Sequence, residues 1–131
     1  NEELLFKFNK QINSNFYVNG DSEQLYRVFL NLIKNSIEAI DEKKQKITNL
    51  QGKITIEMSM NNEYIVIEML DNGIGFNDVA NITKPYFTTK KQGTGLGLPI
   101  VSKIINDHGG EINFLKNSDG AKIVIKLPIY Q

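Results

Sequence analysis

Two asparagines in one expected helix are the first side chains whose type and spacing suggest chemistry. Asn31 and Asn35 are four residues apart, so they lie one turn apart on one helix face, and Glu38 extends the same strip. Asparagine is a mediocre helix former, so an amide pair in mid-helix suggests a role outside the helix. Side-chain carbonyl oxygens suit a hard cation such as Mg²⁺, which keeps several waters and shares phosphate oxygens. Such pairs also occur by chance on exposed helix faces, and both interpretations stay open on this feature alone.

A carboxylate stands at the end of a strongly apolar segment. Asp71 opens the sequence Asp71-Asn72-Gly73, immediately before a glycine turn. A carboxylate at a strand end could accept a hydrogen bond from an exocyclic amine, such as that of adenine. The same residue could instead begin an Asx turn, because D-N-G is a strong turn sequence. From this residue alone, the turn is the better-supported interpretation.

Glycines and lysines gather in one long irregular segment. Five of the ten glycines fall between Gly73 and Gly97, and the run G-T-G-L-G at 93–97 ends where a helix is expected. No acidic residue occurs between Asp78 and Asp107, whereas four lysines do: Lys84, Lys90, Lys91 and Lys103. A glycine loop that enters a helix N-terminus beside lysines predicts a polyphosphate site, with Lys90 and Lys91 as the better candidates. A flexible hinge or a solvated basic lid without a ligand would explain the same pattern.

Length and composition narrow the class of protein. The 131 residues fit one domain, and 15 basic residues balance 15 acidic ones, which argues against a nucleic-acid or membrane-surface binder. The chain has no cysteine and a single histidine, His108, so disulfides, thiol catalysis and multi-histidine metal sites are excluded. No apolar run approaches the roughly 18 residues that span a bilayer. Because the chain begins with Asn1 rather than methionine, we expect it to be a piece of a longer protein.

The first elements that must position these groups follow from hydrophobic periodicity. Residues 1–20 fit two short strands, with Phe6 and Phe8 alternating in the first and a turn near 13–15. A helix is then expected from Ser22 to about Asp41. Asp21 would be its N-cap, and a glutamine three residues later would complete a capping box.

The remaining elements complete a layered fold. A hairpin is expected over 53–60 and 63–70, with two asparagines between the strands that tolerate positive φ. A second helix over 98–108, capped by His108 and ended by two glycines, precedes strands at 111–116 and 121–127. We therefore predict an α+β fold. It is a two-layer α/β sandwich in which helices cover one face of a mixed, mostly antiparallel sheet.

Four motifs occur in a fixed order: N-L-I-K-N at 31–35, D-N-G-I-G at 71–75, P-Y-F-T-T-K at 85–90 and G-T-G-L-G-L at 93–98. Together they resemble the N, G1, F and G2 boxes of the ATP-binding catalytic domain of sensor histidine kinases. That domain has the Bergerat, or GHKL, nucleotide-binding fold, shared with type II topoisomerases, the MutL repair proteins and a heat-shock chaperone. The resemblance covers about residues 21–128, and its wording is most similar to the nitrogen-regulation group, NtrY and NtrB.

The resemblance implies ATP and Mg²⁺ as cofactors and gives each motif a role. Asn35, helped by Asn31, would hold the Mg²⁺ that bridges the ATP phosphates, and Asp71 would accept the adenine amino hydrogen bond. Gly73 and Gly75 would let the backbone pass beneath the base. The lid and the last motif would close the site: Phe87 would hold the lid, and Lys90, Thr94, Gly95, Leu96, Gly97 and Leu98 would surround the phosphates. The expected catalytic residues are Asn31, Asn35 and Lys90.

The resemblance also favours a kinase over an ATPase. Relatives that hydrolyse ATP carry a glutamate four residues before the metal-binding asparagine, where this chain has Asn31. Transfer to water would be slow, so the implied acceptor is a histidine on a separate dimerisation domain, with a response regulator downstream. The chain, 1–131, would be the catalytic part only, a cytoplasmic domain whose parent protein could be anchored in the inner membrane. The alternatives are a same-fold ATPase and a non-enzymatic nucleotide-binding docking module.

Two positions depart from the pattern of this family. Ser36 follows the metal-binding asparagine where alanine is usual, which we interpret as a small change. The last hairpin usually reads G-T-x-F, whereas this chain has Gly120-Ala121-Lys122-Ile123 and so lacks the threonine hydroxyl and the aromatic ring. The second departure puts a minor contact near the adenine pocket in doubt.

Overall fold

The computed structural model describes residues 4–11, 17–76 and 97–130. Segments whose apolar residues recur every second residue form strands, and segments whose apolar residues recur about every 3.6 residues form helices, as expected. The elements in chain order are β1 (Leu4–Lys10), α1 (Ser22–Lys44), β2 (Gly52–Met60), β3 (Tyr64–Asp71), α2 (Gly97–Asp107), β4 (Glu111–Lys116) and β5 (Ala121–Pro128).

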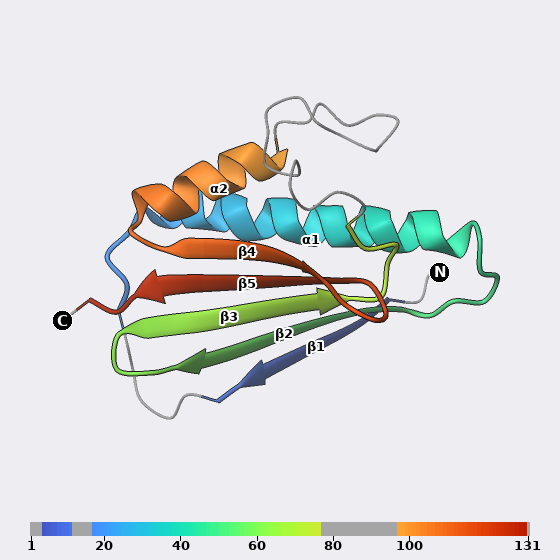
Figure 1. Ribbon diagram of the computed structural model, residues 1–131, viewed down its shortest axis with the longest axis horizontal. Helices are drawn as coiled ribbons and strands as arrows, with labels where there is room; N and C mark the ends of the chain where they lie inside the picture. Colours follow the sequence, from blue (N-terminus) through green and yellow to red (C-terminus); the bar gives the residue numbers. More distant parts are fainter. Residues whose placement is uncertain (1–3, 12–16, 77–96, 131) are drawn as a thin grey trace.

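The strands form one five-stranded sheet, and both helices lie on the same side of it (Figure 1). The strand order is β1-β2-β3-β5-β4. The edge strand β1 runs parallel to β2, and the other three pairs are antiparallel. The predicted α+β sandwich with a mostly antiparallel sheet is therefore confirmed.

Apolar side chains from both layers meet between the helices and the sheet. Val28, Leu32 and Ile40 of α1 are at most 2% exposed, and Val101 and Ile105 of α2 are fully buried. These residues recur at helical spacing, and the inward residues of β3 and β5 alternate as a strand with one buried face requires. This packing fixes the position of α1 over the sheet, and with it the position of the asparagine pair.

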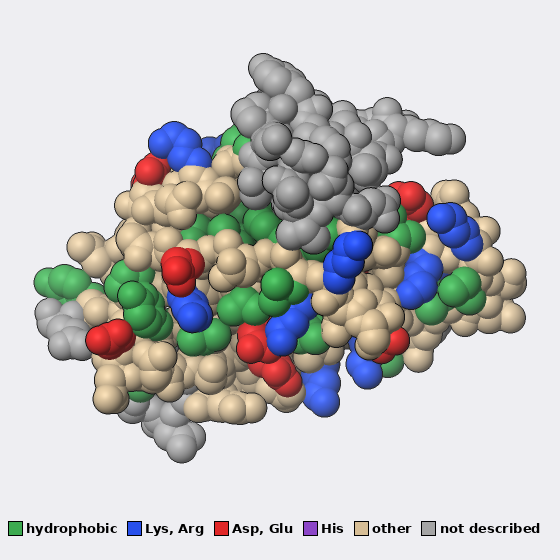
Figure 2. Space-filling view, viewed as in Figure 1, with side chains coloured by type: hydrophobic (Ala, Val, Ile, Leu, Met, Phe, Trp, Pro, Cys, Tyr) green, Lys and Arg blue, Asp and Glu red, His purple; other side chains and the backbone are tan. Residues whose placement is uncertain are grey.

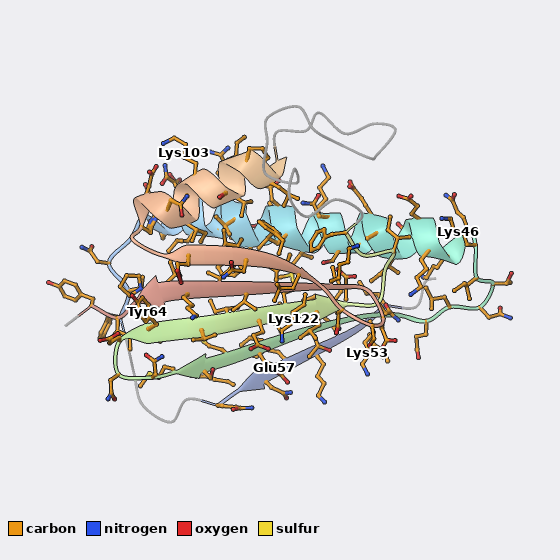
Figure 3. All side chains as sticks on the ribbon, viewed as in Figure 1. Lys46, Lys53, Glu57, Tyr64, Lys103 and Lys122 are labelled. Carbon is orange, nitrogen blue, oxygen red and sulfur yellow. The ribbon has the colours of Figure 1, made fainter. Side chains whose placement is uncertain are left out.

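The opposite face of the sheet carries polar and charged side chains of both signs. Lys122 on β5 pairs with Glu68 on β3 at 3.7 Å, and Glu57 on β2 accepts a hydrogen bond from Asn9 on β1 (Figure 3). In the space-filling view, Lys and Arg side chains are interspersed with Asp and Glu rather than gathered by sign (Figure 2). Neither helix in the described ranges is long and apolar enough to cross a membrane.

The start of α1 confirms one sequence prediction and corrects another. Asp21 is the N-cap, and its carboxylate accepts from the N–H groups of Glu23 and Gln24 at 2.9 and 3.1 Å. The predicted capping box is wrong in its second half, because the N–H of Asp21 donates to Nε2 of His108 at 3.0 Å. The Nδ1 of the same ring lies 2.8 Å from the carbonyl oxygen of Ile104, so His108 caps α2 as expected and also joins its end to α1.

Three further features differ from the sequence prediction: a helix end, a strand and a turn. Helix α1 runs to Lys44 instead of ending near Asp41. Its last turn therefore includes two lysines, whose positive charge stabilises the negative end of the helix dipole. The second N-terminal strand is wrong for Tyr17 and Val18, which are not in a strand, and residues 12–16 lie outside the described residues. The carbonyl oxygen of Tyr17 accepts the N–H of Tyr130 at 2.7 Å. The β2–β3 turn does not use positive φ at Asn61. The side-chain oxygen of Asn61 instead accepts hydrogen bonds from the backbone N–H groups of Glu63 and Tyr64.

Candidate functional site

Asp71 is a buried carboxylate at the end of β3, held by two donors. Asp71 is only 7% exposed. Oδ1 accepts the N–H of Gly73 at 2.9 Å, which is the Asx turn that the sequence suggested. Oδ2 accepts the hydroxyl of Ser36 at 2.8 Å. Because one donor fixes each oxygen, the plane of the carboxylate is set, and each oxygen keeps a further lone pair for a ligand.

Ser36 is the site residue that sequence reasoning missed. It lies in the middle of α1 and is 3% exposed, in register with the buried apolar residues Leu32 and Ile40 one turn to either side. A hydroxyl buried without a partner costs about 1–3 kcal/mol, so a serine in an apolar stripe signals a buried acceptor. That acceptor is Asp71, since the second neighbour, the sulfur of Met69 at 3.9 Å, is a weak one.

The turn after Asp71 is wedged between α1 and the β4–β5 turn. A Cβ on Gly73 would lie 2.7 Å from the backbone carbon of Ala39, and the N–H of Ile74 donates to the oxygen of Ala39. Gly75 has φ +80°, a conformation that favours glycine, and a Cβ placed on it would lie 3.0 Å from the oxygen of Gly120. The glycines predicted to pass beneath a base thus have packing reasons of their own: Gly73 lies against α1, and Gly75 lies against the β4–β5 turn.

Asn72 anchors the same turn from the other side. Its side-chain oxygen accepts the N–H of Lys53 at 2.8 Å, and its amide nitrogen donates to the carbonyl oxygen of Gln51 at 2.8 Å. These contacts tie the end of β3 to the start of β2. The position of Asp71 is therefore fixed by strand pairing, by Asn72 and by the helix above it.

The asparagine pair and the start of α2 come together on the other flank of α1. The amide nitrogen of Asn31 donates to the carbonyl oxygen of Arg27 at 3.0 Å. Its Oδ1 is then turned towards α2 and lies 3.7 Å from the position that a Cβ on Gly97 would take. Gly97, at the described end of the G2 motif, is therefore a neighbour of Asn31 in the fold, and Asn35 lies one turn further along α1.

These donors suit a cation only if other ligands join them. Asn31 and Asn35 offer neutral amide oxygens, and the described residues contain no group of three or more His, Cys, Asp or Glu that could hold a metal. Such a set fits Mg²⁺ that also binds phosphate oxygens and water, and not a metal bound by protein ligands alone. Helix α2 has no acidic residue in its first turn, so its N-terminus favours an anion beside Gly97.

The described residues form a cavity near the end of α1 and another where the start of α1 meets the end of α2. One, of about 470 Å³, is bordered by the turn from Gly73 to Phe76, by the β4–β5 turn, by Lys43 at the end of α1 and by Lys46 just after the helix. The other, of about 500 Å³, is lined by residues around His108 and Tyr130 and contains none of the predicted site residues. The first cavity meets the predicted site only at Gly73 and Gly75, and Asp71 and the asparagine pair do not line it.

The structure brings together only part of the predicted set. Asn31, Asn35, Asp71, Gly73, Gly75, Gly97 and Leu98 lie in the described residues, on α1, on the turn after β3 and at the start of α2. Phe87, Lys90, Thr94, Gly95 and Leu96 lie outside the described residues. The groups that are described lie on the elements around one region, the space between α1, the end of β3 and the start of α2.

Comparison with known sequences identifies a single family. Residues 20–131 match the family described as "Histidine kinase-, DNA gyrase B-, and HSP90-like ATPase". Sporulation kinase C of Bacillus subtilis is 36% identical over 115 residues, which are 86% of this chain and 25% of that protein. The sensory histidine kinase/phosphatase NtrB of Azospirillum brasilense is 36% identical over 122 residues, 86% of this chain and 30% of that protein. The predicted resemblance to sensor kinases including the NtrB group is confirmed. The chain spans only a quarter to a third of these relatives.

Solved structures agree with the sequence comparison. The catalytic domain of histidine kinase ThkA is 33% identical and superimposes with a TM-score of 0.78, covering 95% of this chain and 78% of that one. The mycobacterial sensor histidine kinase MprB superimposes with a TM-score of 0.79 over 96% of this chain and 84% of that one. At 22% identity, the second likeness shows the fold alone.

Proposed function

Because this chain belongs to the family of histidine kinase-, DNA gyrase B- and HSP90-like ATPases, we propose that it binds Mg·ATP and donates the γ-phosphate to a histidine. The accepting histidine would lie on a separate phosphoacceptor and dimerisation domain, and a response regulator would receive the phosphate next. The chain would thus be the catalytic part of a two-component sensor kinase, 1–131 of a longer protein.

The observation that carries this proposal is the geometry of Asp71. A carboxylate that is 7% exposed, with one internal donor on each oxygen, is an acceptor of fixed direction at a strand end. The exocyclic amine of adenine is a donor that such a group can accept. Gly73 and Gly75 would border the base, because the turn that they form is held against α1 and cannot swing away.

The phosphates would lie between the asparagine pair and the start of α2. Asn35 and Asn31 would hold Mg²⁺, with Gly97, Leu98 and the α2 N-terminus facing the anion. The bound Mg²⁺ would neutralise phosphate charge and orient the γ-phosphoryl group. We assign Phe87 to holding the lid, and Lys90, Thr94, Gly95 and Leu96 to the phosphates, on their motifs.

The residue at position 31 supports transfer to a histidine rather than to water. Asn31 has no basic group, and its amide is already committed to Arg27, so it would orient the cation and phosphate without activating a water molecule. The single histidine of the chain is an unsuitable acceptor. Both ring nitrogens of His108 are engaged, by Asp21 and by Ile104.

Phosphotransfer in trans tests the proposal. The 131-residue chain is mixed with γ-labelled ATP, Mg²⁺ and the histidine-bearing helical domain of its parent protein, and label on that domain is followed. We expect transfer by the wild-type chain and by Asp107→Asn, an exposed substitution on α2, and loss of transfer in Asn35→Asp, where an added charge disturbs the cation site.

The rivals give different outcomes in the same experiment. Steady release of labelled phosphate without labelling of the acceptor would favour a same-fold ATPase. Bound ATP with neither release nor transfer would favour a docking module.

A further inference from the structure

We infer that Ser36 is a positioning residue for recognition of the purine amino group, acting through Asp71. The inference rests on the proposed ATP site and deepens it by naming a residue that sets base specificity. The hydroxyl of Ser36 contacts Asp71 and Met69, and we assign it no contact with the phosphates. It acts by fixing the acceptor that the base would meet.

The hydroxyl of Ser36 has one proton, and the geometry assigns it to Asp71. The Oγ–Oδ2 distance of 2.8 Å is that of a good O–H···O hydrogen bond, whereas the sulfur of Met69 is 3.9 Å away. With its proton on Asp71, Ser36 presents only lone pairs to any neighbour. The ionised carboxylate also presents only lone pairs.

This part of the pocket is therefore a set of acceptors held in fixed directions. The main-chain N–H of Gly73 holds Oδ1, and the hydroxyl of Ser36 holds Oδ2. A purine that carries an amino donor complements this set, and a purine without that donor leaves the remaining lone pair of a buried carboxylate oxygen desolvated and without a donor. Recognition of the amine depends on both internal donors, and Ser36 is the only side-chain donor to Asp71 in the part of the chain that the structure describes.

Among the residues that the structure describes, no hydroxyl other than that of Ser36 donates to Asp71. The residue directly across the β3–β5 ladder from Asp71 is Ala121, which is 4% exposed and carries no polar group. Ser36 itself cannot turn away to water, because it is 3% exposed between Leu32 and Ile40 on the buried stripe of α1. Removal of the hydroxyl would leave Oδ2 of Asp71 buried without its donor.

A pair of nucleotides that differ only in the amine tests the inference. ATP and purine riboside 5′-triphosphate, which lacks the 6-amino group, are titrated into the wild-type chain and into Ser36→Ala, Ile40→Val and Asp71→Asn. The readout is the ratio of the two dissociation constants within each variant, so any difference in the folded fraction cancels. Ile40→Val is the matched control, since it trims the same buried stripe one turn from Ser36 without touching a polar atom.

In the wild-type chain we expect ATP to bind on the order of 100-fold more tightly than the analogue. Ser36→Ala should reduce that ratio about tenfold, mainly by weakening ATP, because an unfixed carboxylate must be reordered on binding. Ile40→Val should keep the wild-type ratio, and Asp71→Asn should abolish the preference.

Each result decides the matter. A ratio in Ser36→Ala within about twofold of the wild-type value, or an equal loss for both nucleotides, would mean that Ser36 only fills space. If Asp71→Asn loses the preference while Ser36→Ala keeps it, the inference fails and the proposed function stands. If the wild-type chain binds neither nucleotide, or prefers neither, both fail.

Discussion

Substitution of Gly73 by alanine probes how the turn after Asp71 is held. The added Cβ would lie 2.7 Å from both the backbone carbon and the Cβ of Ala39, and 2.8 Å from the nitrogen of Ile40. The two carbon–carbon separations are about 0.8 Å or more below the roughly 3.5–4.0 Å at which carbon atoms pack. Helix α1 cannot retreat, because Ile40 is 2% exposed against the sheet. The turn itself must therefore shift.

The expected cost follows from the contacts that such a shift stretches. The hydrogen bonds from Gly73 to Asp71, at 2.9 Å, and from Ile74 to Ala39, at 3.3 Å, both lengthen. Overpacking of this kind costs about 1–3 kcal/mol. Taking about 2 kcal/mol, the midpoint of thermal unfolding should fall by roughly 6–10 °C for a chain of this length. Circular dichroism measures the midpoint, and calorimetry should find weaker ATP binding, because Asp71 loses a fixed donor.

Gly97→Ala is the matched control for stability. Its added Cβ would have a single neighbour, Oδ1 of Asn31 at 3.7 Å, which is an ordinary contact. Alanine is also the better helix former, so the unfolding midpoint should be unchanged or slightly higher. The reasoning is refuted if Gly73→Ala unfolds at the wild-type temperature with unaltered ATP affinity, or if the two glycine variants lose the same stability.

Two further predictions concern the contact between the start of α1 and the end of α2. Asp21→Ala should lower the free energy of unfolding by about 1 kcal/mol in urea denaturation, whereas Asp21→Ser should retain most of it, because serine also caps helices. Equal stability of the two variants would contradict the capping role. His108→Ala removes the acceptor of the Asp21 N–H and the ring contact with the Ile104 carbonyl, so it should cost about 1–2 kcal/mol and speed hydrogen exchange at the Asp21 amide. Unchanged exchange at that amide would refute the contact.

The order and type of the elements could be predicted because their patterns are long and local. The 23 residues of α1 repeat their apolar positions over six turns, and β2 to β3 alternate over two adjacent runs. The second N-terminal strand was wrong at Tyr17 because the alternation there is short, and the backbone contact that the described residues show is the N–H of Tyr130 donating to the oxygen of Tyr17. A short pattern gives no information about whether a neighbouring strand is present.

The site was predictable as motifs and only partly as contacts. The D-N-G turn at Asp71 and the shared face of Asn31 and Asn35 follow from local rules. The bond from Ser36 to Asp71 joins residues 35 apart, and the bond from Asp21 to His108 joins residues 87 apart. Such contacts depend on how α1 sits over the sheet. Local periodicity does not specify that position to within the length of a hydrogen bond.

The most direct test of the central claim is calorimetric titration of ATP, with Mg²⁺ present, into the wild-type chain and Asp71→Asn. Asp107→Asn, the same exchange at an exposed position on α2, is the control. We predict measurable ATP binding to the wild-type chain and the control, and binding to Asp71→Asn that is weaker by on the order of 100-fold. Equal ATP affinity in all three proteins would contradict the assignment of Asp71 to the base.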